Sequence, residues 1–227
     1  MRGAVILAAW LPLAGTAAAQ SRPVVAELFT SEGCSSCPPA DALLAEIART
    51  RPDVLPLAFH VTYWNNLGWP DPFSLPAATA RQREYATWLG LDGLYTPQLV
   101  VDGRRDVVGS DRAGVAAAVR AAERDAAAAV PLTVTRDAAG VQVRAGAGGG
   151  RGEVLLIGFD PLHRTRVGRG ENAGRTLAEA NIVRSLQVLG RWDGTPLALA
   201  GPAPAGERVA VLLQAADGRV LGAAVAP

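Results

Sequence analysis

The stretch Thr30-Ser31-Glu32-Gly33-Cys34-Ser35-Ser36-Cys37-Pro38-Pro39 holds the only two cysteines of a 227-residue chain. An apolar run from Val24 to Phe29 precedes it and predicts a buried strand. The residues from Ala40 to Arg49 follow it, and their apolar side chains recur at helical spacing. A strand, a Cys-x-x-Cys pair and a helix in this order are the context in which two cysteines predict redox chemistry.

The position of the two sulfurs suggests different roles for them. A thiolate is the nucleophile in disulfide exchange, and the N-terminus of a helix favours negative charge. Cys34 lies where the first unpaired N–H groups of the predicted helix point, and Cys37 lies one turn further along. We therefore expect Cys34 to be the attacking and more exposed sulfur and Cys37 to be the resolving one. The alternatives for the pair are an inert local disulfide, two free thiols or a metal site.

The first residues predict a segment that is removed from the mature protein. Arg2 is followed by an apolar run, Ala4 to Leu13, that is too short to span a membrane. Small residues from Gly15 to Ala19 then form an A-x-A pattern, so we expect residues 1–19 to be a signal peptide cut after Ala19. The alternative is an uncut anchor helix. We expect an exported, soluble protein, periplasmic or secreted, with no stable membrane insertion, in a compartment where a disulfide can persist.

Charge and composition exclude some classes of partner. The formal net charge is +1, so no overall field favours nucleic acid, and we expect no nucleic-acid partner. Hydrophobic residues make up 49% of the chain, which is ample for a core.

The rest of the first half alternates between predicted strands and helices. Residues 53–61 form a second apolar strand, and residues 62–76 form a long loop rich in Trp, Asn, Gly and Pro. Long loops in compact domains are often functional. Further along the chain we expect a helix, two strands joined by a turn at Asp102-Gly103, and a last helix, at residues 77–89, 98–101, 107–109 and 112–128.

The resulting order, β-α-β-α-β-β-α, is that of the thioredoxin fold, and residues 24–130 resemble thioredoxin-like proteins. More narrowly, the chain resembles a family of exported bacterial proteins, the domain-of-unknown-function 1223 family. The strings that this resemblance rests on are Leu28–Ala40, His60-Val61-Thr62-Tyr63-Trp64, Gly68-Trp69, Arg81-Gln82, Tyr95-Thr96-Pro97-Gln98 and Gly168-Arg169-Gly170-Glu171-Asn172. The last of these extends the resemblance into the C-terminal half.

The resemblance to thioredoxin-like proteins implies roles for the Thr-Pro step. It implies that Pro97 follows a cis peptide bond and faces the two cysteines, and that the backbone of Thr96 hydrogen-bonds a substrate peptide. The sequence departs from typical thioredoxin in two places. Gly33 stands where an aromatic residue often precedes the first cysteine, and Ser35-Ser36 between the cysteines supplies hydroxyls but no charge.

Four residues of the second strand and the long loop are further site candidates. His60 ends the strand, at the edge of an α/β sheet that carries functional sites, and is a candidate proton shuttle or third metal ligand. The alternative is a histidine packed under the loop with its nitrogens hydrogen-bonded. Tyr63, Trp64 and Trp69 are candidates for one wall of a substrate cleft, or they pin down the loop.

Two polar features are predicted to be plain surface. Arg81 and Glu84 are expected on a solvated helix face. Residues 168–175 are expected to form a surface loop held by internal ion pairs, with an ordered functional loop as the alternative.

The C-terminal half predicts a different architecture from the first. Short strands with turn residues between them indicate a small, mainly antiparallel β-sandwich or barrel. The predicted organisation is thus a signal peptide at 1–19, an α/β thioredoxin-like domain at 20–130 and a β domain at 131–227. The strands are expected at 132–135, 141–144, 153–159, 182–189, 197–200, 209–214 and 220–225.

These patterns favour an exported thiol–disulfide oxidoreductase that acts on protein or peptide disulfides. Cys34 would attack, Cys37 would resolve, Pro97 and Thr96 would position the substrate, and His60 would assist proton transfer. We expect no cofactor besides the disulfide itself, and an external redox partner to regenerate it. One alternative is a soft-metal protein that binds or delivers copper through Cys34, Cys37 and His60. The other is a non-catalytic binding module.

Overall fold

A computed structural model describes residues 22–125 and 129–226. The predicted signal peptide, residues 1–19, lies outside the described residues. No helix in the two described ranges is both long enough and apolar enough to cross a membrane.

The first half of the chain alternates strands and helices, and two of the helices begin with proline. Pro38 and Pro76 stand at the first positions of their helices, where a missing N–H costs nothing. The elements are β1 (Val24–Thr30), α1 (Pro38–Thr50), β2 (Val54–His60), α2 (Pro76–Leu89), β3 (Gln98–Val101), β4 (Arg105–Val108) and α3 (Arg112–Asp125).

The second half consists of strands, and two of them are much longer than the sequence pattern suggests. β7 has 15 residues and β8 has 17, and together they form one antiparallel hairpin. The elements are β5 (Leu132–Asp137), β6 (Gly140–Ala145), β7 (Gly152–Arg166), β8 (Thr176–Trp192), β9 (Leu197–Gly201), β10 (Arg208–Ala215) and β11 (Val220–Val225).

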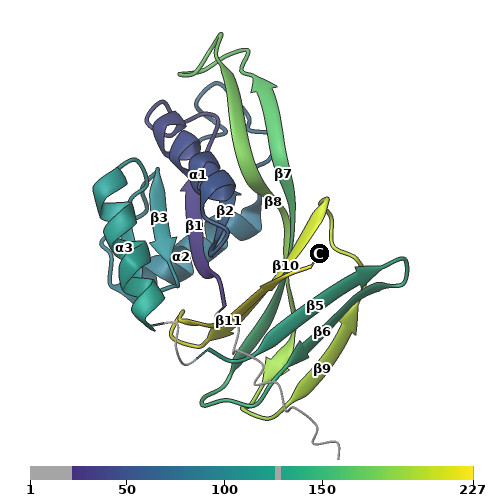
Figure 1. Ribbon diagram of the computed structural model, residues 1–227. Helices are drawn as coiled ribbons and strands as arrows, with labels where there is room; N and C mark the ends of the chain where they lie inside the picture. Colours follow the sequence, from purple (N-terminus) through teal and green to yellow (C-terminus); the bar gives the residue numbers. More distant parts are fainter. Residues whose placement is uncertain (1–21, 126–128, 227) are drawn as a thin grey trace, which may run out of the picture.

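The prediction of a thioredoxin-like α/β domain followed by a separate β-sandwich or barrel is wrong. One mixed sheet of eight strands, in the order β11-β10-β7-β8-β2-β1-β3-β4, runs through both halves of the chain. A second sheet holds three strands, β5-β6-β9. The described chain is therefore a mostly β fold with three helices, and its two halves share their main sheet (Figure 1).

The reason for this error lies at the open edge of β2. All seven residues of β2 are buried, so the strand is covered on both faces. Such a strand cannot leave its edge unpaired, because its backbone N–H and C=O groups would lose both water and a partner. β8 joins β2 in parallel, with Ile182 opposite Ala58. The paired residues are more than 120 positions apart in the sequence, so the local pattern of apolar residues cannot predict the pairing.

Three hydrophobic clusters hold the layers together. The alternation of β1 sends Val25 and Phe29 into a cluster with α2 and the strands β7 and β10. It sends Ala26 and Leu28 into a second cluster with α1 and α3 on the opposite face. A third cluster, centred on Trp192, packs β7, β8, β10 and β11 against the three-stranded sheet. The β7–β8 hairpin rises from this third cluster to the end of the molecule where α1 begins (Figure 1).

Candidate functional site

The two cysteines form a disulfide at the start of α1. Their Cα atoms are 5.4 Å apart, and Cys37 directly precedes the first residue of the helix. Both residues have an exposed fraction of 0%, so the expectation that Cys34 is the more exposed sulfur is wrong. Ser35 and Ser36, between them, are exposed. The disulfide thus lies just below the surface under a turn of two serines.

Thr96 and Pro97 lie against the sulfur of Cys34. The Thr96–Pro97 peptide bond is cis, as the resemblance implies. The hydroxyl of Thr96 donates a hydrogen bond to Cys34 Sγ at 3.3 Å, and it accepts one from Trp64 Nε1 at 2.9 Å. Because the indole already donates to the Thr96 oxygen, the hydroxyl proton is directed to sulfur. Ser36 Oγ also lies 3.3 Å from Cys34 Sγ.

The three aromatic candidates of the long loop have different surroundings. Trp64 contacts the cysteine site through its hydrogen bond to Thr96. Trp69 Nε1 donates at 2.7 Å to Oε2 of Glu32, which lies two residues before Cys34 in the sequence. Tyr63 instead donates to Gln82 Oε1 of α2 at 3.2 Å. The two tryptophans therefore belong to the surroundings of the disulfide, and Tyr63 ties the loop to α2.

The loop that joins β7 to β8 covers the cysteine turn. The Nδ2 group of Asn172, which is buried, donates to the backbone oxygens of Glu32 and Cys34, both at 2.9 Å. Glu171 Oε2 accepts a hydrogen bond from the Ser35 N–H at 3.0 Å. The prediction of a plain surface loop at residues 168–175 is wrong. These residues, together with the flanking Val167, form a cover over the site.

Glycines allow this cover to approach closely. Gly170 has φ 76°, and a Cβ atom there would lie 3.1 Å from Cβ of Trp69. A Cβ atom on Gly33 would lie 3.3 Å from Cβ of Trp64. A side chain at Gly33 would crowd Trp64, and one at Gly170 would crowd Trp69.

His60 is fully buried and belongs to a cluster of carboxyl groups. His60 Nδ1 lies 2.8 Å from Asp71 Oδ2, and His60 Nε2 lies 3.8 Å from Glu179 Oε1 of β8. Asp71 Oδ2 also accepts the backbone N–H of Glu32 at 2.8 Å. Within the described part of the chain, no hydrogen bond joins His60 to either cysteine, so His60 contacts the cysteine turn through Asp71.

The ionisable groups in this cluster shift one another's pKa values. Burial opposes a charged imidazole, but Asp71 and Glu179 outweigh it and raise the pKa of His60 to about 10. Burial raises the pKa of Glu179 to about 8, against the attraction of His60. Burial likewise raises the pKa of Asp41, on α1, to about 6, against its hydrogen bond from Thr30. At neutral pH the cluster therefore holds a charged His60–Asp71 pair, beside a Glu179 carboxyl group whose pKa is raised.

Arg81 is not on a solvated helix face, and that prediction is wrong. It is buried and forms a two-point ion pair with Glu27 of β1, and it donates to Gln214 Oε1 of β10 at 2.9 Å. Tyr85 O–H donates to Glu27 Oε1 at 2.6 Å. Glu84 is exposed, as expected. The Arg81 network joins α2 to both halves of the chain and serves the fold.

The geometry does not favour a metal centre. Among the residues that the structure describes, no group of three or more His, Cys, Asp or Glu side chains is arranged to hold a metal ion. A cavity of about 1010 Å³ lies between α2 and the lower part of β7 and β8, and Trp88, Leu186 and Arg191 line it. None of the predicted site residues lines this cavity.

The family of the chain follows from its sequence. A family model described as "Protein of unknown function (DUF1223)" matches residues 25–214. The chain belongs to the DUF1223 family. The match includes both cysteines and the cover over them. No curated protein matches the chain.

Two solved structures resemble this member of the DUF1223 family. A crystal structure of a protein from Agrobacterium tumefaciens is 34% identical in sequence, with a TM-score of 0.80, and the alignment covers 92% of this chain and 95% of that one. HBP35 of Porphyromonas gingivalis is 15% identical, with a TM-score of 0.60, over 89% of this chain and 74% of that one. The second likeness is one of fold alone.

Sequence reasoning missed several residues around the disulfide. Glu32, Asp41, Asp71 and Glu179 are buried acids, and burial of a charge is not visible in a local pattern. For Asn172 a signal existed, because the string Gly168–Asn172 is part of the family resemblance. The two glycines of this string, within five residues, fit a backbone that must pass close to an aromatic side chain.

Proposed function

We propose that this protein catalyses thiol–disulfide exchange through the Cys34–Cys37 pair. The observation that supports this most is the hydrogen bond from the Thr96 hydroxyl to Cys34 Sγ. A hydroxyl donor stabilises a thiolate at Cys34 once the disulfide is reduced, and the adjacent start of α1 acts in the same direction. Cys37 lacks such a donor among the hydrogen bonds of the described residues.

In the reductive direction the exchange takes two steps. A substrate thiolate attacks Cys34 Sγ, the Cys34–Cys37 bond breaks, and Cys37 leaves as a thiolate that takes up a proton. The second thiol of the substrate then attacks the first substrate sulfur, which is bonded to Cys34 in the mixed disulfide. The bond between the two proteins breaks, and Cys34 leaves as a thiolate. The substrate dithiol is oxidised to a disulfide, and its two protons end on the cysteines. The reverse sequence oxidises the protein and reduces a substrate disulfide.

Asp41 and His60 would assist this chemistry from below. Asp41 lies one turn after Cys37 on α1, and its backbone N–H donates to the Cys37 oxygen at 3.1 Å. Burial raises its pKa to about 6, closer to neutral pH than that of an ordinary aspartate, which suits proton exchange with the Cys37 thiolate. His60 holds Asp71 on the Glu32 amide and so fixes the turn that carries Cys34.

The setting that fits this function is a compartment outside the cytoplasm, where disulfides persist, with an external partner to regenerate the pair. The copper alternative has no support from the arrangement of side chains.

The test is the reduction potential of the pair, measured by equilibration with glutathione buffers, together with insulin reduction. We expect a potential between about −120 and −270 mV and insulin reduction that Cys34→Ser abolishes. A potential below about −300 mV with no insulin reduction would mark the disulfide as structural and would favour the binding-module alternative. Glu84→Gln, on the exposed face of α2, is the matched control that should leave both values unchanged.

A further inference from the structure

The cover over the disulfide carries an uneven distribution of charge. The segment from Leu162 to Ala178, which we call the hairpin end, holds four arginines and one glutamate. All four arginines are exposed, and none takes part in an ion pair of the described residues; they are Arg164, Arg166, Arg169 and Arg175. Elsewhere some arginines, such as Arg51 and Arg112, have carboxylate partners, while others, such as Arg120, have none among the described residues and lie apart from the disulfide. The hairpin end is therefore a positive surface on a nearly neutral protein.

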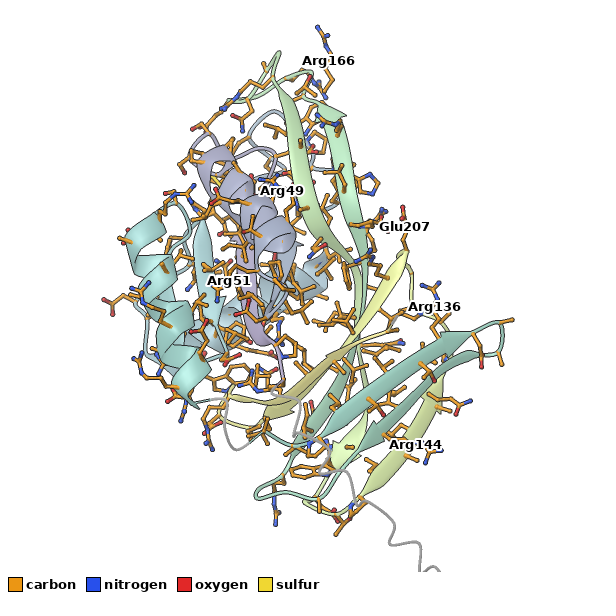
Figure 2. The ribbon with its side chains drawn as sticks, in the orientation of Figure 1. Arg49, Arg51, Arg136, Arg144, Arg166 and Glu207 are labelled. Atoms are coloured by element: carbon orange, nitrogen blue, oxygen red, sulfur yellow. A yellow bond between two sulfur atoms is a disulfide. The ribbon has the colours of Figure 1, made fainter. Side chains whose placement is uncertain are left out.

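This surface lies next to the disulfide and projects beyond the rest of the molecule. Asn172 and Glu171 hold it to the backbone of residues 32–35. Figure 2 shows Arg166 pointing away from the protein at the tip of the hairpin, at the opposite end from Arg144. These contacts place the segment that carries the four arginines against the cysteine turn.

Glu171 indicates what kind of group binds at the backbone N–H of Ser35, between the two cysteines. Its side chain is exposed, yet its carboxylate accepts the Ser35 N–H, and this hydrogen bond lowers the pKa of Glu171. A carboxylate therefore already occupies the backbone N–H between the two cysteines. An acidic side chain of a partner can take the same hydrogen bond, and the surrounding arginines would favour it.

We propose that the hairpin end binds an acidic segment of a protein partner, which replaces Glu171 at the Ser35 amide and brings its thiols to Cys34. This inference rests on the proposed exchange function and adds the chemistry of the partner. Arginines around a buried reactive group would raise the rate of encounter with an acidic partner at low ionic strength. The steps of exchange remain those given above, with the partner dithiol oxidised and the Cys34–Cys37 disulfide reduced.

The experiment compares two synthetic dithiol peptides as reductants of the full chain. One peptide carries glutamates on both sides of a Cys-x-x-Cys pair, and the other carries lysines at the same positions. Exchange is stopped with acid and followed by alkylation and mass spectrometry. We expect the acidic peptide to react about tenfold faster at low salt, with the difference falling below about twofold at 1 M salt.

Charge reversal on the hairpin end tests whether the arginines cause this preference. The variant Arg166→Glu/Arg169→Glu should lose the preference for the acidic peptide, and its reaction with uncharged dithiothreitol should stay within about twofold of the native rate. The matched control, Arg120→Glu/Arg144→Glu, has the same change of net charge on exposed arginines of α3 and β6. It should keep the preference.

The possible failures are distinguishable. Equal rates with the two peptides would overturn the acidic-partner proposal and leave the exchange function intact. Equal rates combined with binding to vesicles that contain about 30% phosphatidylglycerol, lost in Arg166→Glu/Arg169→Glu, would overturn it in favour of a membrane surface. If neither peptide nor dithiothreitol reduces the pair, the exchange function and this proposal both fall.

Discussion

The hydroxyl of Thr96 donates a hydrogen bond to Cys34 Sγ, and a single substitution can remove it. Trp64 donates to the same hydroxyl, so its proton is directed to sulfur. Thr96→Val keeps the shape of the side chain and removes the donor. A hydrogen bond to a charged group contributes about 1.5–3 kcal/mol, so we expect the pKa of the Cys34 thiol in the reduced protein to rise by about one unit.

The measurement for Thr96→Val is the thiolate absorbance of the reduced protein during a pH titration. Thr96→Ser keeps the hydroxyl and should titrate like the native protein. An unchanged pKa in Thr96→Val would show that the hydrogen bond does not stabilise the thiolate, and the assignment of Cys34 as nucleophile would lose its main support.

His60 makes the stability of the fold depend on pH. The fold raises the pKa of His60 from 6.5 to about 10, so its contribution is fully present below pH 6.5 and is lost as pH rises toward 10. Burial raises the pKa of Glu179 from 4.5 to about 8, which also lowers the stability of the fold as pH rises from 4.5 to 8. The free energy of unfolding should therefore fall by several kcal/mol between pH 6.5 and 10.

Urea unfolding at a series of pH values checks this, with His60→Gln as the informative variant. This variant should be less stable than the native protein at pH 6.5. Between pH 6.5 and 10 its free energy of unfolding should fall by no more than half as much as that of the native protein. His163→Gln, on the partly exposed hairpin, should keep the native slope. A native slope in His60→Gln would show that other groups cause the pH dependence.

At the scale of elements, the loop of the β7–β8 hairpin contacts the cysteine turn, and we expect it to limit access to the disulfide. Asn172→Ala removes two hydrogen bonds to the cysteine turn while Glu171 keeps its own. Because both sulfurs are fully buried in the closed state, a looser cover should speed the reduction of the disulfide by dithiothreitol, by about tenfold. Stopped samples alkylated and analysed by mass spectrometry give this rate.

Ala173→Ser is the control for Asn172→Ala, because Ala173 is exposed on the same loop. It should reduce at the native rate. Equal rates in all three proteins would mean that opening of this loop does not limit access to Cys34.

The sequence predicts elements better than it predicts their assembly, and the reason is the range of the interactions. The strand before Cys34, the helix after Cys37 and the cis bond at Pro97 all follow from neighbouring residues or from the family resemblance. The partnership of β2 with β8 and the contact of Asn172 with Cys34 do not, because they join residues more than 120 positions apart. The buried acids around His60 were missed because burial of a charge is not visible in a local pattern.

Both halves of the described chain contribute strands to one sheet, so we expect them to unfold together. β8 closes the edge of β2, and the Arg81 network links α2 and β1 to Gln214 of β10. We therefore expect a single unfolding transition, with far-ultraviolet circular dichroism and tryptophan fluorescence reporting the same midpoint. A fragment of residues 22–130 should fail to fold, since its β2 edge has no partner.

Two separated transitions in the full chain, or a cooperative transition in the fragment, would contradict this expectation. A fragment that carries Pro56→Asp, a charge within β2, distinguishes failure to fold from aggregation through the unpaired β2 edge. It should be more soluble than the native fragment but equally unfolded.

The cover and the cysteines are made at different times. Asn172 is 138 residues beyond Cys34, so a growing chain exposes the thiols well before the residues that will enclose them exist. At the rates at which chains are synthesised, that interval lasts on the order of ten seconds. The cysteines can therefore pair, or react with any oxidant they meet, in an open state that the finished protein no longer has. The first oxidation of the pair can thus precede the folding of the cover, and only later exchanges require a partner to reach Cys34 beneath it.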